Sequence, residues 1–205
     1  MEQTLPFPLP YAADALEPII SQRTMELHDA LAAGYANNFP AAQAGVPAAV
    51  NQGEQSLREQ LRTLSFQGSG YVLHNVYFAN MAPAGSGGAP GPNTMRLVTQ
   101  QYPSLTAFQH TFLGAGNAAE GPGWAVWGWL PATSKPYILQ CEEHNNKTIW
   151  GIIPMLVLDV WEHAYLLDYG SNRAAYTAGW WQLINWDDVE YRVTMALQGK
   201  LPMIT

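Results

Sequence analysis

The chain has 205 residues, of which 48% are hydrophobic and 12% aromatic, and this is enough apolar material for a substantial globular core. Its formal net charge is −7 with only 9 Lys and Arg residues, which argues against a nucleic-acid partner, because phosphate backbones require clustered positive charge. The single cysteine, Cys141, permits no internal disulfide and excludes metal or redox motifs built from several cysteines.

The N-terminal residues 1–6 lack the basic start and apolar core of a secretory signal. No window of about 18 consecutive apolar residues follows, which is the length that a membrane-spanning helix needs. We therefore expect a soluble, cytoplasmic protein with no membrane partner.

The first half of the chain is predicted to be helical. Residues 24–35 are rich in alanine and favour a helix, whereas residues 41–50 are small and include a proline, which favours a turn. A second helix is predicted between residues 52 and 81, with a polar first part and an apolar pattern around His74. His74 is therefore expected on the buried side of this helix.

A segment rich in Gly and Pro, residues 84–93, cannot form a regular element and is the natural domain boundary. We predict a helical hairpin domain over residues 1–83, a linker over residues 84–93, and an α+β domain over residues 94–205.

The second half is predicted to contain helices, then strands, then helices again. The helices are expected at residues 94–102, 104–114, 179–183 and 189–197, and the strands at residues 124–130, 136–141 and 152–158. Helices followed by strands in sequence order predict an α+β fold and not a parallel, doubly wound sheet. We expect a three-stranded antiparallel sheet surrounded by helices.

Residues 159–165, directly behind the last predicted strand, combine polar groups that are costly to bury. Asp159 ends the apolar run and His163 follows four positions later, so a buried strand brings a carboxylate and an imidazole to one point. A carboxylate with imidazoles and no thiolate favours iron or manganese, because zinc favours sites rich in thiolates. The structural alternatives are that Asp159 caps the next helix and that His163 is a hydrogen-bonded core residue.

Two further histidines lie on the predicted helices of the first half. His28 is on the first helix and His74 on the second, so a helical hairpin can present both imidazoles to Asp159 and His163. Taken singly, each histidine is more often structural or exposed than a metal ligand. Together, the four residues would bind one ion between the two halves of the chain.

The motifs of this chain resemble those of the iron/manganese superoxide dismutases. The matching segments are Leu9–Tyr11, Asp14–Pro18, Ile20–Ser21, Glu26–His28, His74, Asn80–Pro83, Gly123–Trp124, Asp159–Tyr165, Asp168–Tyr169, Asn172–Arg173 and Asn185–Trp186. They are distributed over nearly the whole chain, so the resemblance covers both predicted halves.

This resemblance implies which residues bind the metal and what the protein acts on. It implies that one iron or manganese ion per subunit is bound by His28, His74, Asp159 and His163. The implied substrate is superoxide, which is converted to oxygen and hydrogen peroxide. The implied assembly is a homodimer, with a tetramer as the larger alternative, in which Glu162 reaches across the interface to a ligand histidine of the partner subunit.

Several positions depart from the family's pattern where substrate would approach the ion. Without a gap in the alignment, the family's histidine pair falls on Ala32 and Ala33, and the tyrosine that bonds to it across the interface is Leu166. The family's gateway tyrosine falls on Ala36, while Tyr35 is one residue away, or about 100° around a helix. Either Tyr35 or Ala36 therefore occupies the gateway position.

The family's metal-adjacent glutamine has no clear counterpart in this chain. Its position corresponds either to Gly70 or to one of Glu143, His144, Asn145 and Asn146. Either asparagine could replace the glutamine, whereas His144 or Glu143 would alter the reduction potential. His144 is otherwise expected at the surface. The residues expected beside the metal or at its gateway are Tyr35, Trp124, Trp127, His144, Asn145 and Asn146.

Replacement of large polar side chains by Ala and Leu predicts a wider and drier space above the ion, suited to an organic molecule. Three interpretations follow: a superoxide dismutase, an iron- or manganese-dependent oxidase or oxygenase of a small organic substrate, or a non-catalytic scaffold. A ligand-sized cavity beside the ion would support the second interpretation, and Tyr35 filling that space would contradict it.

Overall fold

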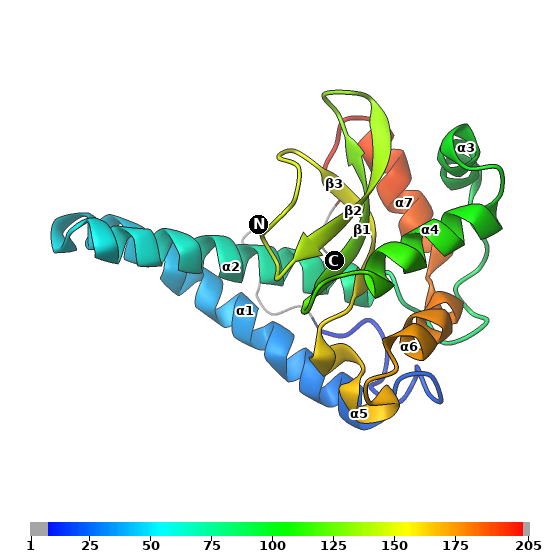
Figure 1. The fold of residues 1–205 in the computed structure, drawn as a ribbon, viewed down its shortest axis with the longest axis horizontal. Coiled ribbons are helices and arrows are strands. Elements are labelled where there is room, and N and C mark those ends of the chain that lie inside the picture. Colours follow the sequence, from blue (N-terminus) through cyan, green and yellow to red (C-terminus); the bar gives the residue numbers. More distant parts are fainter. Residues whose placement is uncertain (1–7, 203–205) are drawn as a thin grey trace.

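The computed structural model describes residues 8–202 (Figure 1). The N-terminal residues 1–6, on which the expectation about a secretory signal depends, lie outside the described part of the chain. Among the helices that the structure describes, none combines the length and the apolar character needed to cross a membrane.

The first half forms a long helical hairpin that projects from the rest of the molecule (Figure 1). Helix α1 spans Gln22–Ala49 and helix α2 spans Glu54–Ala79, with a short 3₁₀ turn at Val50–Gln52 between them. The reversal is completed by Gly53, whose φ of +100° is a conformation that residues with a side chain rarely adopt.

The turn expected over residues 41–50 is wrong, because α1 continues through Pro40 and Pro47 to Ala49. Each proline removes one backbone hydrogen bond from the helix. Both prolines are exposed, so water can satisfy the carbonyls that lose their donors. Ala42 and Ala49 meanwhile are buried on another side of α1, and this packing maintains the helix.

The second half has the predicted α+β architecture around a three-stranded antiparallel sheet with strand order β2-β1-β3. The strands are β1 (Gly123–Leu130), β2 (Lys135–Glu142) and β3 (Ile153–Asp159). The helices are α3 (Pro92–Gln101), α4 (Leu105–Asn117), α5 (Leu166–Tyr169), α6 (Arg173–Trp180) and α7 (Trp186–Leu197). The predicted strands and the helices beginning near residues 94 and 104 are confirmed, whereas the helix expected at residues 179–183 begins earlier, at Arg173, and ends in a 3₁₀ turn.

The sheet is covered on both sides, which explains why its central strand is apolar almost throughout. Helix α4 packs against β1, and α2 and α7 pack against β3 (Figure 1). The segment between α2 and α3 contains neither a helix nor a regular strand. The division into two domains with a linker at residues 84–93 stays a prediction.

Candidate metal centre

Four side chains from three separate stretches of the sequence converge where the hairpin meets the sheet. His28 comes from α1, His74 from α2, Asp159 from the end of β3, and His163 from the 3₁₀ turn Glu162–Ala164. Their possible ligand atoms all lie within 4.8 Å of one another. The structure therefore brings together all four residues that the sequence predicted as ligands.

The Asp159 carboxylate is oriented by its neighbours. Its Oδ1 accepts a hydrogen bond from the backbone N–H of Trp161 at 2.8 Å. Its Oδ2 lies 3.2 Å from the Nε2 atoms of both His28 and His163, and 3.8 Å from Nε2 of His74. One oxygen is thus held by the backbone while the other faces three imidazoles.

Two of these imidazole nitrogens are buried without a hydrogen-bond partner, namely Nε2 of His28 and Nε2 of His74. The Nε2 of His28 is close to Asp159, yet the geometry is not that of a hydrogen bond. The other nitrogen of His74, Nδ1, bonds to the carbonyl oxygen of Gly70 at 2.7 Å and fixes the ring. Unpaired buried polar atoms are rare and costly, and a metal ion would satisfy both.

The protonation states also suit a cation. Burial lowers the pKa of His28 and His74, so both imidazoles are neutral at pH 7. Burial alone would raise the pKa of Asp159, but the nearby imidazoles of His163 and His28 bring it well below its usual range. Three imidazoles and one carboxylate form a donor set appropriate to iron or manganese, so the residues present fit such an ion.

Tyr35, and not Ala36, lies beside the cluster. The Tyr35 ring stacks on the His74 ring with 4.9 Å between centroids, and its hydroxyl bonds to Nε2 of His144 at 2.8 Å. Gly70 makes room for it, because a Cβ at that position would lie 2.7 Å from the Tyr35 ring. Tyr35 therefore fills the space where a wider, drier pocket was expected, and the prediction of a ligand-sized cavity there is wrong.

His144 is buried, with 2% of its surface exposed, so its expected surface position is wrong. Trp124 donates from Nε1 to Nδ1 of His144 at 3.1 Å. Because the indole N–H can only donate, the proton of a neutral His144 resides on Nε2, which donates to the Tyr35 oxygen. Burial lowers the pKa of His144 to about 4, so the ring is neutral at pH 7.

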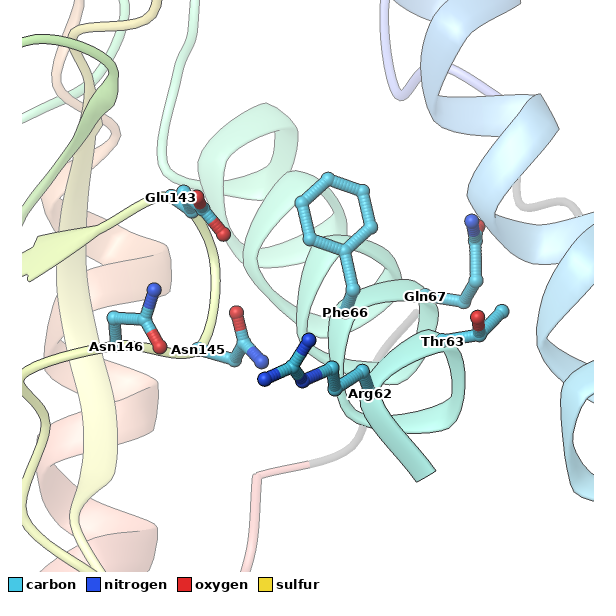
Figure 2. Close-up of a pocket in the computed structure, with 7 residues that line it drawn as sticks. All are labelled: Arg62, Thr63, Phe66, Gln67, Glu143, Asn145 and Asn146. Carbon is cyan, nitrogen blue, oxygen red and sulfur yellow. The ribbon is translucent and has the colours of Figure 1, made fainter. Parts of the chain in front are cut away.

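The two asparagines that follow His144 do not lie against the ligand cluster. Asn145 donates to the hydroxyl of Ser65 at 2.9 Å, and Asn146 is exposed, with its backbone paired to Glu142. Both asparagines line an outer pocket of about 530 Å³ between α2 and the β2–β3 loop. Figure 2 shows them there together with Arg62, which lines the same pocket. Of the four loop residues considered for the glutamine position, His144 is the one whose ring lies beside a candidate ligand, 5.5 Å from the His74 ring.

The two tryptophans predicted beside the metal have different surroundings. The Trp124 ring lies 5.0 Å from the His74 ring, in the expected place. The Trp127 ring packs 5.0 Å from Phe108 of α4, because β1 carries it into the core between the sheet and that helix. Trp127 is thus a core residue, and its expected position beside the metal is wrong.

Some aromatic residues near the cluster were not predicted from the sequence. Trp161 stacks on His144 at 4.6 Å and on His163 at 5.5 Å, Phe66 lies 4.7 Å from His144, and Tyr77 lies 5.2 Å from His28. Trp161 belongs to the motif at residues 159–165, which could have indicated it. Nothing in the local sequence distinguishes Phe66 or Tyr77 from ordinary core residues.

Comparisons with known proteins agree with this geometry. Residues 3–82 match the alpha-hairpin domain of iron/manganese superoxide dismutases, and residues 90–192 match the C-terminal domain of iron/manganese superoxide dismutases. The superoxide dismutase [Fe] of Pyrobaculum aerophilum is 41% identical over 204 residues, covering 98% of this chain and 96% of that protein. The superoxide dismutase [Mn/Fe] of Aeropyrum pernix is 37% identical over 205 residues, covering 96% of this chain and 93% of that protein.

Proposed function

Because the chain belongs to the iron/manganese superoxide dismutase family, we propose that its superoxide dismutase activity takes place at one iron or manganese ion bound by His28, His74, Asp159 and His163. The observation that carries this assignment is the pair of buried, unpartnered Nε2 atoms of His28 and His74 facing Oδ2 of Asp159. A bound ion would supply one-electron chemistry by alternating between its divalent and trivalent states.

The reaction converts two superoxide ions and two protons into oxygen and hydrogen peroxide, so the protein must also hold protons near the ion. Tyr35 is suited to this role, because burial raises its pKa to about 12 and keeps its hydroxyl protonated at pH 7. His144 donates to the Tyr35 oxygen, which leaves the Tyr35 O–H free to donate toward the cluster or to solvent.

His144 takes the place that glutamine has in many members of the family. It is held by the Trp124 N–H on one side and stacks on Trp161 on the other. Such neighbours orient the groups around a metal and adjust its properties. We infer that the Trp124–His144–Tyr35 chain positions the Tyr35 hydroxyl and helps to set the reduction potential of the bound ion.

The surface beside His163 supports a homodimer. Glu162 is exposed, Leu166 and Leu167 are 52% and 54% exposed, and the His163 side chain is 22% exposed. Exposed apolar residues next to a charged motif are typical of an interface. We infer that a second copy covers this face and that Glu162 contacts a ligand histidine there, as in other members of the family. A tetramer and a cytoplasmic location stay predictions.

The test combines metal content, activity and mass on the same protein loaded with Mn²⁺ or Fe²⁺. We expect one ion per chain, removal of superoxide, and a mass of twice 22.5 kDa by light scattering. His74→Ala should lose both the ion and the activity, whereas His110→Ala, at an exposed position on α4, should keep both. Fully metallated protein that leaves superoxide untouched would refute the function, and a mass of one chain would refute the dimer.

A further inference from the structure

We propose that Asn80, which touches none of the four candidate ligands, is a positioning residue for the metal centre. It follows α2 directly and is fully buried. Its side chain joins the helix that carries His74 to the strand that carries Asp159. This inference rests on the proposed function, because it concerns the distance between two of the proposed ligands.

The Asn80 side chain lies along the outer edge of β3, where no other strand of the described sheet pairs with it. Strand β3 is at the end of the order β2-β1-β3 and pairs only with β1 in the described sheet. On its other edge, the N–H of Val157 donates to Oδ1 of Asn80 at 2.9 Å, and Nδ2 of Asn80 donates to the carbonyl of Met155 at 3.2 Å. The amide thus bonds to β3 as the backbone of a neighbouring strand would.

The two ends of this link are close to the cluster and are rigidly connected to it. His74 precedes Asn80 by six residues, about 9 Å along a helix. Asp159 follows Val157 by two residues, about 7 Å along a strand. Sliding β3 past α2 would therefore change the separation of His74 Nε2 from Asp159 Oδ2, which is 3.8 Å. Asn80 opposes that movement.

A second set of bonds fixes which way the Asn80 amide points. Its Nδ2 also donates to Oδ2 of Asp188 at 2.7 Å, and the same oxygen accepts from Nε of Arg192 at 2.7 Å. The backbone carbonyl of Asn80 accepts from the backbone N–H of Asn185 at 2.8 Å and holds the residue in place. Because a carboxylate can only accept, the amide nitrogen must face Asp188, and the amide oxygen must then face Val157.

Stability alone does not explain why the core contains this polar link. Asn80 and Arg192 are both buried, and buried polar groups stabilise a core only when their hydrogen bonds are made. An apolar residue could fill the same space but would not favour one position of β3 along α2. The polar link therefore determines the alignment of strand and helix.

The experiment measures the dissociation constant for Mn²⁺ and the electron paramagnetic resonance spectrum of the Mn²⁺-loaded protein. In Asn80→Ala we expect Mn²⁺ affinity to fall about tenfold or more, with an altered spectrum. The matched control is Thr94→Val, because Thr94 is also buried and bonds to Glu190 of α7, but it does not bond to β3. It should lose stability while its affinity and spectrum stay as in the wild type.

A second variant provides a test that does not depend on the folding of Asn80→Ala. Asn80→Asp has the same shape and keeps an acceptor for the Val157 N–H, but it has no N–H for the Met155 carbonyl and places a carboxylate beside Asp188. Asn80→Asp should therefore bind Mn²⁺ more weakly than Thr94→Val. Wild-type affinity and spectrum in Asn80→Ala or in Asn80→Asp would overturn the positioning role. Wild-type protein that does not bind Mn²⁺ would instead overturn the proposed metal centre, and this inference with it.

Discussion

At the scale of single residues, the contact between Gly70 and Tyr35 determines what lies above His74. A side chain at position 70 would collide with the Tyr35 ring, which could then no longer stack on His74 while bonding to His144. Gly70 is thus required by a close approach, although it is in the interior of a helix, where glycine normally weakens structure.

We therefore expect Gly70→Ala to be less stable than Gly34→Ala by about 1–3 kcal/mol, the usual cost of overpacking. Gly34 is a matched control, because it is also inside a helix of the hairpin and a Cβ there meets nothing within 4 Å. Both variants gain the same helix propensity, so their difference isolates the collision. Urea unfolding of both proteins measures it, and equal stabilities would show that Tyr35 moves aside at no cost.

The four candidate ligands could be predicted from the sequence, whereas the residues around them could not. Asp159 and His163 are in one short motif whose flanking residues, together with the family resemblance, indicate a metal, and the same resemblance supports His28 and His74. The position of His144 depends on how the β2–β3 loop packs against Tyr35 and Trp161, which come from other elements. A contact made by tertiary packing leaves no signal in the local sequence.

At the scale of elements, α1 shows how packing outweighs local propensity. The small residues and the proline within residues 41–50 predict a turn, and only the burial of Ala42 and Ala49 reveals why the helix continues. Pro40 is exposed, and a proline there removes the hydrogen bond that residue 40 would make to the Ala36 carbonyl. Helix α1 is therefore longer than its local sequence predicts.

Replacing Pro40 by alanine should consequently stabilise the protein. Pro40→Ala restores one helical hydrogen bond and replaces the poorest helix former with the best, so we expect the free energy of unfolding to rise by about 1–3 kcal/mol. Pro131→Ala is the control, because Pro131 is exposed in the β1–β2 turn, where a proline restricts the unfolded chain, and its loss should be neutral or slightly destabilising. Chemical denaturation that ranks the two variants in the opposite order would contradict this account.

At the scale of the whole molecule, the order of helices and strands was sufficient to predict an α+β fold, but not how its halves are joined. The joining contacts connect residues that are far apart in the sequence, such as Asn80 with Val157 and His28 with Asp159. The candidate metal centre is another such contact, because its four side chains come from α1, α2, the end of β3 and the turn after it.

Removing the metal should therefore destabilise the entire molecule and not just the site. Without an ion, the buried Nε2 atoms of His28 and His74 lack partners, and the hairpin loses a connection to β3. A ligand present at a thousandfold its dissociation constant contributes about 4 kcal/mol, and each kcal/mol shifts the melting temperature of a protein of this size by about 2–4 °C. We expect a chelator to lower the melting temperature by about 8–16 °C.

In His74→Ala the chelator should have almost no effect, because the ion is already absent. Calorimetry with parallel metal analysis measures both proteins, and a wild-type melting temperature that stays constant while its metal is removed would show that the ion does not hold the two halves together.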